Sequence, residues 1–332
     1  MKKLFCTLLA AALFLLPLTG CGKKDDNLIR LNEVTHSIFY APLYLAMSLG
    51  YFEDEGLTVE LTNGGGADKS MAAVLSGDAD IGLMGPEAAI YVLTGGRQNS
   101  VQIIGQLTKR DGSFLMSRID EPDFDYSSMA GKEVIAGRRG GVPAMVLEYV
   151  LRQKGLIDGE NITLNYDVQF NMTSSAFLGG VGDYVTMFEP TASEVVREGR
   201  GYIVASIGQS GGEVPYTAFM ATKSYLANNG EKVQKFLNAV YKAMLYVQTG
   251  DDAEMAELLR EHFPGTADQS LIDSLASYKR IDAWMTDPVM KEESLDRLQM
   301  IMTEAGELDA PVAYADLVNN TFAEQAIASV TL

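Results

Sequence analysis

Cysteine and histidine are scarce in this 332-residue chain, and each scarcity excludes kinds of site. The only cysteines are Cys6 and Cys21, so the chain after residue 21 has no disulfide, no thiol nucleophile and no cysteine metal ligand. The only histidines are His36 and His262, and no HExxH or comparable ligand spacing surrounds them. We therefore expect neither a metal site nor a bound cofactor.

Positive charge is also scarce, with 26 lysines and arginines against 44 aspartates and glutamates, for a formal net charge of −18. This balance argues against nucleic acid as a partner, because phosphate backbones are bound by basic surfaces. It does not exclude a small anionic ligand, since one or two arginines and local dipoles can override the global field. Long apolar runs are missing after residue 27, so we expect no transmembrane helix there.

The amino end has the pattern of a targeting segment. Two lysines precede an apolar stretch over residues 4–18, which is short for a membrane span. The tetrapeptide LTGC that ends at Cys21 resembles the lipobox of bacterial lipoproteins, which are cut before the cysteine and lipidated on it. We therefore expect a signal peptide over 1–20, lipid on Cys21 and a tether over 21–27, which would hold the protein on the membrane outside the cytoplasm, at the cell surface or in the periplasm. An ordinary secretory signal with an incidental cysteine is the alternative.

The rest of the chain repeats a unit of strand, loop and helix. The strands end in loops at 35–40, 62–68 and 84–87 in a first series, and at 137–143, 170–173 and 189–190 in a second. Right-handed crossovers between parallel strands put such loops on one edge of a sheet, where open α/β sheets hold ligands. The pattern therefore predicts two α/β lobes, each with a ligand-type edge.

Two lobes joined by two crossings imply a ligand cleft between them. The predicted first lobe is discontinuous and comprises 28–118 and 215–332, and the predicted second lobe is 119–214. Helices continue to the end of the chain after residue 250 and form an acidic extension with no strands of its own. We expect this extension to pack on the first lobe.

Several stretches together resemble one branch of the solute-binding proteins of ABC importers. They are Ala41–Ala46, Gly50–Glu53, Glu55–Val59, Leu75–Gly82 and Phe188–Ala192. The branch holds receptors for aliphatic sulfonates, nitrate, taurine and thiamine pyrimidine precursors, together with the thiamine-pyrimidine synthases. The resemblance covers roughly residues 28–250. It implies a type II periplasmic-binding fold, hinge closure of the lobes on a ligand, a monomeric receptor, and partnership with an ABC permease and its ATPase.

The predicted ligand-binding residues lie in the loops at the strand ends or beside the second crossing. They are His36, Phe39, Tyr40, Gly65, Gly66, Glu87, Arg138, Arg139, Gly140, Phe170, Asn171, Glu189 and Tyr216. Aromatic faces at Phe39 and Tyr40 suit stacking on a heteroaromatic ring. The glycine run at 64–66 lets the backbone approach a ligand closely.

Two charged motifs point to different ligands. Glu189 suits hydrogen bonds from amino groups, as on an aminopyrimidine, although a carboxylate at a helix start also serves as a plain cap. Arg138 and Arg139 precede a helix and suit an anion, although a solvated arginine pair has the same sequence. Asn171 can donate and accept.

We therefore expect a receptor for a small heteroaromatic solute such as a thiamine pyrimidine precursor. The alternatives are a receptor for an alkanesulfonate, nitrate or another small anion, a receptor for an amino acid or another nucleobase-like solute, a synthase on the same fold, and a lipoprotein sensor without a transport partner. The resemblance implies that the synthase uses a pyridoxal-bearing lysine, a histidine and a cysteine-rich segment. This chain has no cysteine after Cys21 and no lysine between Asn27 and Gly66, so we expect no enzyme.

Overall fold

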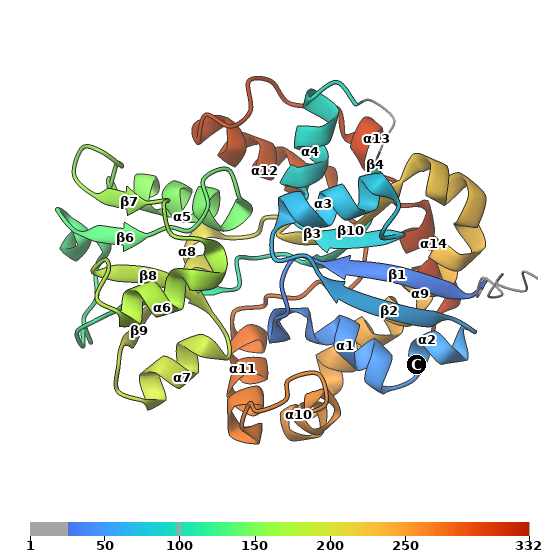
Figure 1. Cartoon of the computed structure of the whole chain (residues 1–332), viewed down its shortest axis with the longest axis horizontal. Helices are drawn as coiled ribbons and strands as arrows, with labels where there is room; N and C mark the ends of the chain where they lie inside the picture. The colour runs from blue at the N-terminus through green and yellow to red at the C-terminus, as the bar shows by residue number, and fades with distance from the viewer. Residues whose placement is uncertain (1–25, 98–100, 332) are drawn as a thin grey trace, which may run out of the picture.

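The computed structural model describes residues 26–97 and 101–331, which form two α/β lobes lying side by side (Figure 1). The predicted signal peptide, Cys21 and most of the tether lie outside the described residues. Within the described ranges, no helix is both long and apolar enough to cross a membrane. The two-lobed α/β fold with a C-terminal helical extension is therefore confirmed.

The first lobe is built on a five-stranded sheet with the order β2-β1-β3-β10-β4. Its strands are β1 (Leu28–Glu33), β2 (Thr58–Asn63), β3 (Ile81–Met84), β4 (Val101–Thr108) and β10 (Thr217–Thr222). The first three are parallel, and β10 runs antiparallel to both β3 and β4. All four residues of β3 are buried, as expected for a central strand covered by helices on both faces.

The second lobe is built on a sheet of the same size with the order β7-β6-β8-β5-β9. Its strands are β5 (Ser113–Ser117), β6 (Glu133–Ile135), β7 (Thr163–Asn165), β8 (Tyr184–Phe188) and β9 (Tyr202–Ser206). Here the sequence-based boundary at residue 118 is wrong, because β5 pairs with β8 and β9. The sequence showed β5 to be a strand but held no signal for which sheet it would join.

Helices cover both sheets. In the first lobe they are η1 (Ile38–Tyr40), α1 (Ala41–Ser48), α2 (Tyr51–Asp54), α3 (Ala67–Ser76), α4 (Glu87–Thr94) and α9 (Lys223–Thr249). In the second lobe they are η2 (Tyr126–Met129), α5 (Val142–Gln153), η3 (Phe170–Met172), α6 (Thr173–Leu178), α7 (Thr191–Arg197) and α8 (Ile207–Gly211). α3 ends at Gly77, whose backbone is left-handed with φ of +82°, a conformation that glycine adopts without strain.

The C-terminal extension does more than cover the first lobe. It comprises α10 (Asp252–Leu259), α11 (Asp268–Arg280), α12 (Glu292–Glu304), α13 (Tyr314–Leu317) and α14 (Thr321–Ser329). α14 packs on α9 and β4, as expected, but α11 contacts α7 and α12 contacts α5, both in the second lobe (Figure 1). Arg197 of α7 donates to the Ser270 hydroxyl at 2.7 Å, and Arg297 of α12 donates to the Gly211 carbonyl at 2.5 Å. The extension therefore bridges the two lobes.

The two crossings between the sheets, residues 109–112 and 212–216, run next to each other. The Val214 N–H donates to the Lys109 carbonyl at 2.9 Å. Just inside the first lobe, the hydroxyls of Thr108 and Thr217 lie 2.5 Å apart. These bonds fix the strand ends from which the cavity between the lobes is built.

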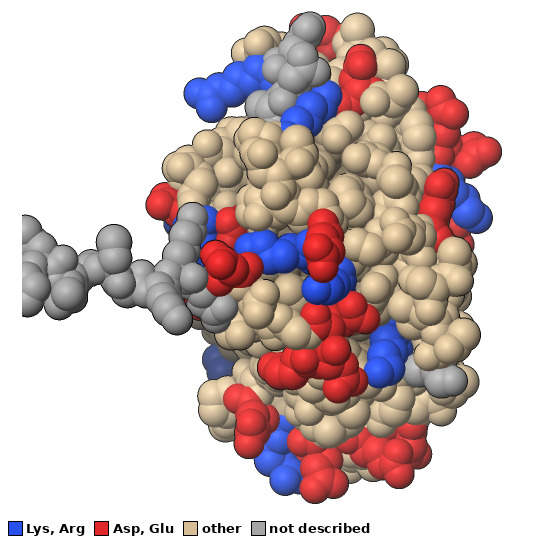
Figure 2. Space-filling view, turned by 90° about the vertical axis from the view of Figure 1, so that its right-hand side faces the viewer, with Lys and Arg blue, Asp and Glu red and all other residues tan. Residues whose placement is uncertain are grey.

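Acidic and basic side chains are mixed on the surface, as the excess of aspartate and glutamate over lysine and arginine leads one to expect. Figure 2 shows the face of the first lobe at which the described chain begins, and basic side chains there are interspersed with acidic ones. One such group on the first lobe is Arg30, which forms an ion pair with Asp80 at 2.7 Å. A surface of this kind does not present the continuous basic area that nucleic acid requires.

Candidate functional site

A cavity of about 80 Å³ lies between the lobes, beside the crossings. It is lined by Val34, Thr35, Ser37, Phe39, Tyr40, Gly66, Ala67, Gly85, Glu87, Arg138, Gly141, Val142, Pro143, Phe188, Tyr216 and Thr217. Most of these residues come from the carboxyl ends of strands and the helix starts that follow them in both lobes, whereas Tyr216 and Thr217 come from the second crossing and the first position of β10. A water molecule needs about 10–15 Å³ on this measure, so the space suits a small ligand. We call this space the central cavity.

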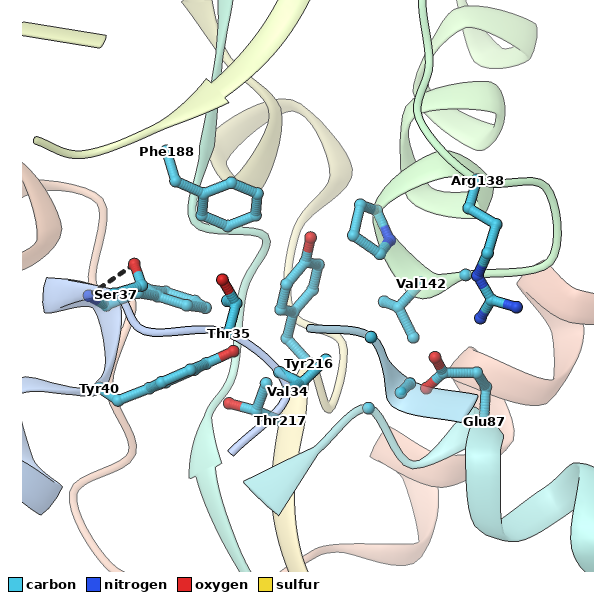
Figure 3. A pocket seen from close by; sticks show the side chains of 16 residues that line it. Val34, Thr35, Ser37, Tyr40, Glu87, Arg138, Val142, Phe188, Tyr216 and Thr217 are labelled. Atoms are coloured by element: carbon cyan, nitrogen blue, oxygen red, sulfur yellow. Dashed lines mark hydrogen bonds between the residues drawn. The ribbon is translucent and has the colours of Figure 1, made fainter. Parts of the chain in front are cut away.

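Aromatic rings form much of the wall of the central cavity. Phe39 packs against Phe188 with ring centroids 5.8 Å apart, and against Tyr216 edge-on at 5.7 Å. The Tyr40 ring lies 5.7 Å from the Phe39 ring. Figure 3 shows Tyr40, Tyr216 and Phe188 arranged around one part of the cavity. Flat apolar faces in this arrangement suit an aromatic ligand ring.

A carboxyl and a guanidinium face each other across the other part of the cavity (Figure 3). Glu87, the first residue of α4, is only 3% exposed, and its Oε2 has no hydrogen-bond partner among the described residues. Burial raises the pKa of Glu87 to about 7, although backbone N–H groups of Glu87, Val142 and Ala88 and the Arg138 guanidinium oppose this rise. At neutral pH the carboxyl therefore can both donate and accept a proton.

The hydroxyl of Tyr216 also points into the central cavity (Figure 3). It is buried, and the Asp111 carboxyl is close enough to form a hydrogen bond with it. Burial raises the pKa of Asp111 to about 7, opposed by Ser113 and Tyr216. Buried polar groups in folded proteins are almost always paired, so the unpaired Glu87 Oε2, rather than the Tyr216 hydroxyl, indicates a ligand contact.

A second cavity of about 180 Å³ adjoins the central one and shares Thr35, Ser37 and Phe188 with it. Its other lining residues are His36, Asn171, Thr173, Ser174, Thr186, Met187, Glu189, Pro190 and Thr191. Hydroxyl and amide groups predominate in this list, in contrast to the aromatic wall of the central cavity. We call this space the polar cavity.

Glu189 in the polar cavity is already paired with the protein. It is 2% exposed, and its two carboxylate oxygens accept from the Ser193 N–H at 3.0 Å and the Ser193 hydroxyl at 2.8 Å. Burial raises the pKa of Glu189, and the bonds from Ser193 oppose the rise. These bonds satisfy an otherwise free N–H in the first turn of α7, which is what a cap does.

His36 joins the rim of the polar cavity to the C-terminal extension. Its Nδ1 lies 2.7 Å from Glu33 Oε1, and its Nε2 lies 2.7 Å from the His262 carbonyl oxygen. Since both partners are acceptors, both ring nitrogens donate when the imidazole is protonated. The hydrogen bond to Glu33 raises the pKa of His36, opposed by burial. The Tyr44 hydroxyl donates to the other Glu33 oxygen at 2.5 Å, so Tyr44 packs rather than faces a cavity.

The structure divides the predicted site residues into three groups. Six line the central cavity, namely Phe39, Tyr40, Gly66, Glu87, Arg138 and Tyr216, and three line the polar cavity, namely His36, Asn171 and Glu189. Gly65, Arg139 and Gly140 line neither. Arg139 lies over the Tyr166 ring at 3.9 Å, and the Gly140 carbonyl accepts from the Tyr91 hydroxyl of α4 at 2.8 Å. The Phe170 side chain is outside what the structure describes.

The prediction missed several residues of the central cavity. Gly85 and Val142 each stand within two residues of a predicted site residue. The sequence therefore located the correct loops but not which of their residues face the cavity. Phe188 stands next to Glu189 in the sequence and was missed because a strand-end phenylalanine usually belongs to the core. Alternation along β8 could have found it, since Phe188 is only partly buried while its neighbour Met187 is fully buried.

Comparison with known proteins places this architecture in a family. The family model described as "NMT1/THI5 like" matches residues 38–252. A Bacillus subtilis (strain 168) protein named "Putative binding protein YtlA" is 40% identical over 316 residues, which cover 95% of each chain. The 4-amino-5-hydroxymethyl-2-methylpyrimidine phosphate synthase of Aspergillus parasiticus is 29% identical over 242 residues, covering 68% of this chain and 67% of the synthase.

Solved structures share the fold at lower identity. The alkanesulfonate-binding protein SsuA of Xanthomonas axonopodis pv. citri, solved with MOPS bound, has a TM-score of 0.73 at 17% identity, covering 89% of this chain and 99% of its own. The resemblance found in the sequence and the periplasmic-binding fold are thereby confirmed. This chain belongs to the NMT1/THI5-like family and has the two-lobed fold of periplasmic binding proteins.

Proposed function

We propose that this protein is the solute-binding component of an ABC importer, not an enzyme, and acts outside the cytoplasm. The two-lobed fold, the cavity between the lobes and the 40% identity to a protein named as a binding protein support this function. Its partners would be a permease and an ATPase. The two crossings would serve as the hinge on which the lobes close around the solute.

The ligand that the central cavity supports best is a small heteroaromatic molecule with an amino group, of the aminopyrimidine class. One observation carries this: the aromatic wall lies in the same cavity as a buried oxygen of Glu87 that has no hydrogen-bond partner among the described residues. An aminopyrimidine edge has an N–H donor beside a ring-nitrogen acceptor. A carboxyl that gains and loses its proton near neutral pH matches both.

The synthase relative raises the possibility of catalysis on the same fold. Within the described residues, neither lysine nor histidine lines the central cavity, so the family's lysine chemistry would have no obvious side chain there. The absence of cysteine after Cys21 also disagrees with the cysteine-rich segment that the resemblance implies for a synthase. Both observations support binding rather than catalysis.

A small oxyanion is the second candidate ligand. The amino end of α5 and Arg138 both face the central cavity, and the alkanesulfonate-binding neighbour shows that this fold accommodates such ligands. The two ligand classes make opposite demands on Glu87, because a carboxylate attracts an amino group and repels an oxyanion.

Thermal unfolding of the chain from residue 26 onward tests both candidates. The panel would hold 4-amino-5-hydroxymethyl-2-methylpyrimidine, ethanesulfonate, nitrate, amino acids and riboflavin. A ligand at 100 times its Kd adds about 2.7 kcal/mol to the free energy of unfolding. We expect stabilisation by the aminopyrimidine and loss of that effect in Glu87→Ala. Stabilisation by the sulfonate or nitrate alone would overturn the heteroaromatic assignment.

We also propose that lipid on Cys21 anchors the protein to the membrane. The apolar stretch and the lipobox-like tetrapeptide before Cys21 support this. In bacteria expressing the full chain, Cys21→Ala is expected to move the protein from the membrane fraction to the soluble or secreted fraction. Retention of the Cys21→Ala protein in the membrane fraction would contradict lipid anchoring.

A further inference from the structure

The Glu87 carboxyl lies at the amino ends of two helices that belong to different lobes. α4 begins at Glu87 itself and α5 begins at Val142, and neither helix has a side-chain cap on its preceding residue. The backbone N–H groups that lower the pKa of this carboxyl come from both helices, since Glu87 and Ala88 belong to α4 and Val142 to α5. Free N–H groups and the helix dipole favour a negative charge at such a place.

Arg138 adds a full positive charge to these two helix ends. Its guanidinium is turned toward the carboxyl (Figure 3) and lowers the pKa of Glu87. Two helix amino ends and an arginine constitute a built anion site. The protein fills that site with its own carboxyl, of which one oxygen is buried and without a hydrogen-bond partner in the described part of the chain.

We infer that Glu87 determines the ligand specificity of the central cavity by supplying, in its ionised form, the negative charge that a small oxyanion would otherwise bring. The carboxyl occupies the anion position, so sulfonates and nitrate are excluded. Its unpaired oxygen is left to accept an N–H from a neutral or cationic heteroaromatic ligand. This inference rests on the proposed function, namely that the central cavity binds a small solute.

Gly85 shows that the position of the carboxyl depends on its neighbours. A Cβ placed on Gly85 would lie 1.9 Å from Glu87 Oε2, closer than any two such atoms can approach. The atom it meets is the far end of a flexible side chain, so Gly85→Ala displaces the Glu87 carboxyl and does not require the backbone to move. This variant moves the charge while keeping it in the protein.

The test is calorimetric titration of the chain from residue 26 onward with ethanesulfonate and with nitrate. We expect no binding to the wild type at millimolar anion. Glu87→Ala should gain affinity for at least one anion by about 10- to 100-fold, the usual effect of pairing a charged group with buried donors. Anion affinity should also rise, but by less, in two further variants. Glu87→Gln keeps the shape of the side chain and removes its charge, and Gly85→Ala displaces the carboxyl.

Glu292→Gln is the matched control. Glu292 is the first residue of α12, as Glu87 is of α4, but it is exposed and lines neither cavity. Its substitution should leave anion binding as in the wild type. The inference is overturned if wild type binds these anions as tightly as Glu87→Ala does, or if none of the Glu87 and Gly85 variants gains anion affinity while all remain folded by circular dichroism.

The same proteins titrated with 4-amino-5-hydroxymethyl-2-methylpyrimidine separate this inference from the proposed ligand class. If the aminopyrimidine does not bind the wild type but Glu87→Ala gains anion binding, the role of Glu87 in excluding anions stands and the aminopyrimidine assignment falls. If the aminopyrimidine binds the wild type and no variant gains anion binding, the proposed ligand class stands and the specificity role falls.

Discussion

Glu87 and Glu189 occupy similar places in the two lobes, and their differences separate a binding group from a capping group. Each stands beside a proline at the end of a strand and before a helix, Gly85-Pro86-Glu87 after β3 and Glu189-Pro190 after β8. Each is almost fully buried. Glu189 has both oxygens bonded to Ser193, whereas Glu87 has an oxygen without a partner in the described chain.

This contrast shows that motif and burial do not identify a ligand-binding carboxyl. The deciding quantity is how many of its hydrogen bonds the protein itself already satisfies. By that measure Glu87 is available for a ligand, and Glu189, which the sequence favoured for an amino group, is largely committed to α7. The predictions below test this difference between the two carboxyls and then between the two neighbouring arginines.

The largest expected effect is on the pH dependence of stability. Burial raises the pKa of Glu87 in the native state to about 7, from an ordinary value of 4.5. Between pH 4.5 and about pH 7 the native protein therefore binds more protons than the unfolded chain does. The free energy of unfolding should therefore fall as the pH rises through that window. Glu87→Gln removes this loss. The free energy of unfolding of Glu87→Gln minus that of the wild type should therefore be about 3 kcal/mol larger at pH 8 than at pH 4.5.

Urea unfolding at the two pH values measures this difference. Asp111, whose pKa is raised to about 7 by burial, contributes in the same direction, so Asp111→Asn serves as a comparison. Because each carboxyl contributes separately, the free energy of unfolding should still depend partly on pH in Glu87→Gln and in Asp111→Asn. An unchanged pH dependence in Glu87→Gln would show that burial does not raise the pKa of this carboxyl in the native state.

The second prediction concerns Glu189. Glu189→Ala leaves the Ser193 N–H and hydroxyl without their acceptor, so we expect the free energy of unfolding to fall by about 2 kcal/mol. A double-mutant cycle with Ser193→Ala assigns the loss to this contact, because the two single effects should then not add. A loss below about 0.5 kcal/mol would remove the capping role and return Glu189 to the candidate ligand groups.

The smallest effect is expected at Arg139. Its side chain is more than half exposed, lies over the Tyr166 ring and approaches Asp158 to only 3.8 Å. Arg139→Ala should change the free energy of unfolding by about 0.5 kcal/mol or less and ligand affinity by less than about twofold. Arg138→Ala should change ligand affinity about tenfold or more, because its guanidinium faces Glu87 inside the cavity. If Arg138→Ala and Arg139→Ala change ligand affinity equally in calorimetric titrations, the conclusion that only Arg138 faces the cavity is wrong.

Adjacent residues such as these show where prediction from sequence fails. Both arginines precede α5 and carry the same charge, and the sequence offered no reason to separate them. The chain turns over residues 138–141, where the Gly141 N–H donates to the Arg138 carbonyl at 3.3 Å, and Arg138 lines the central cavity while Arg139 lies over the Tyr166 ring. Likewise β5 was recognised as a strand, but the choice between sheets depends on pairing with β8 and β9, which lie far away in sequence.

The alternation of strands and helices, the loops at strand ends and the family could be predicted from the amino-acid sequence, because periodicity, glycine and proline positions and short motifs act locally. The folded chain was needed to show which loop residues face the cavity, which carboxyl keeps a free oxygen and that the C-terminal helices bridge both lobes. These features depend on contacts between segments distant in the chain, and on the burial and hydrogen bonding that result from them.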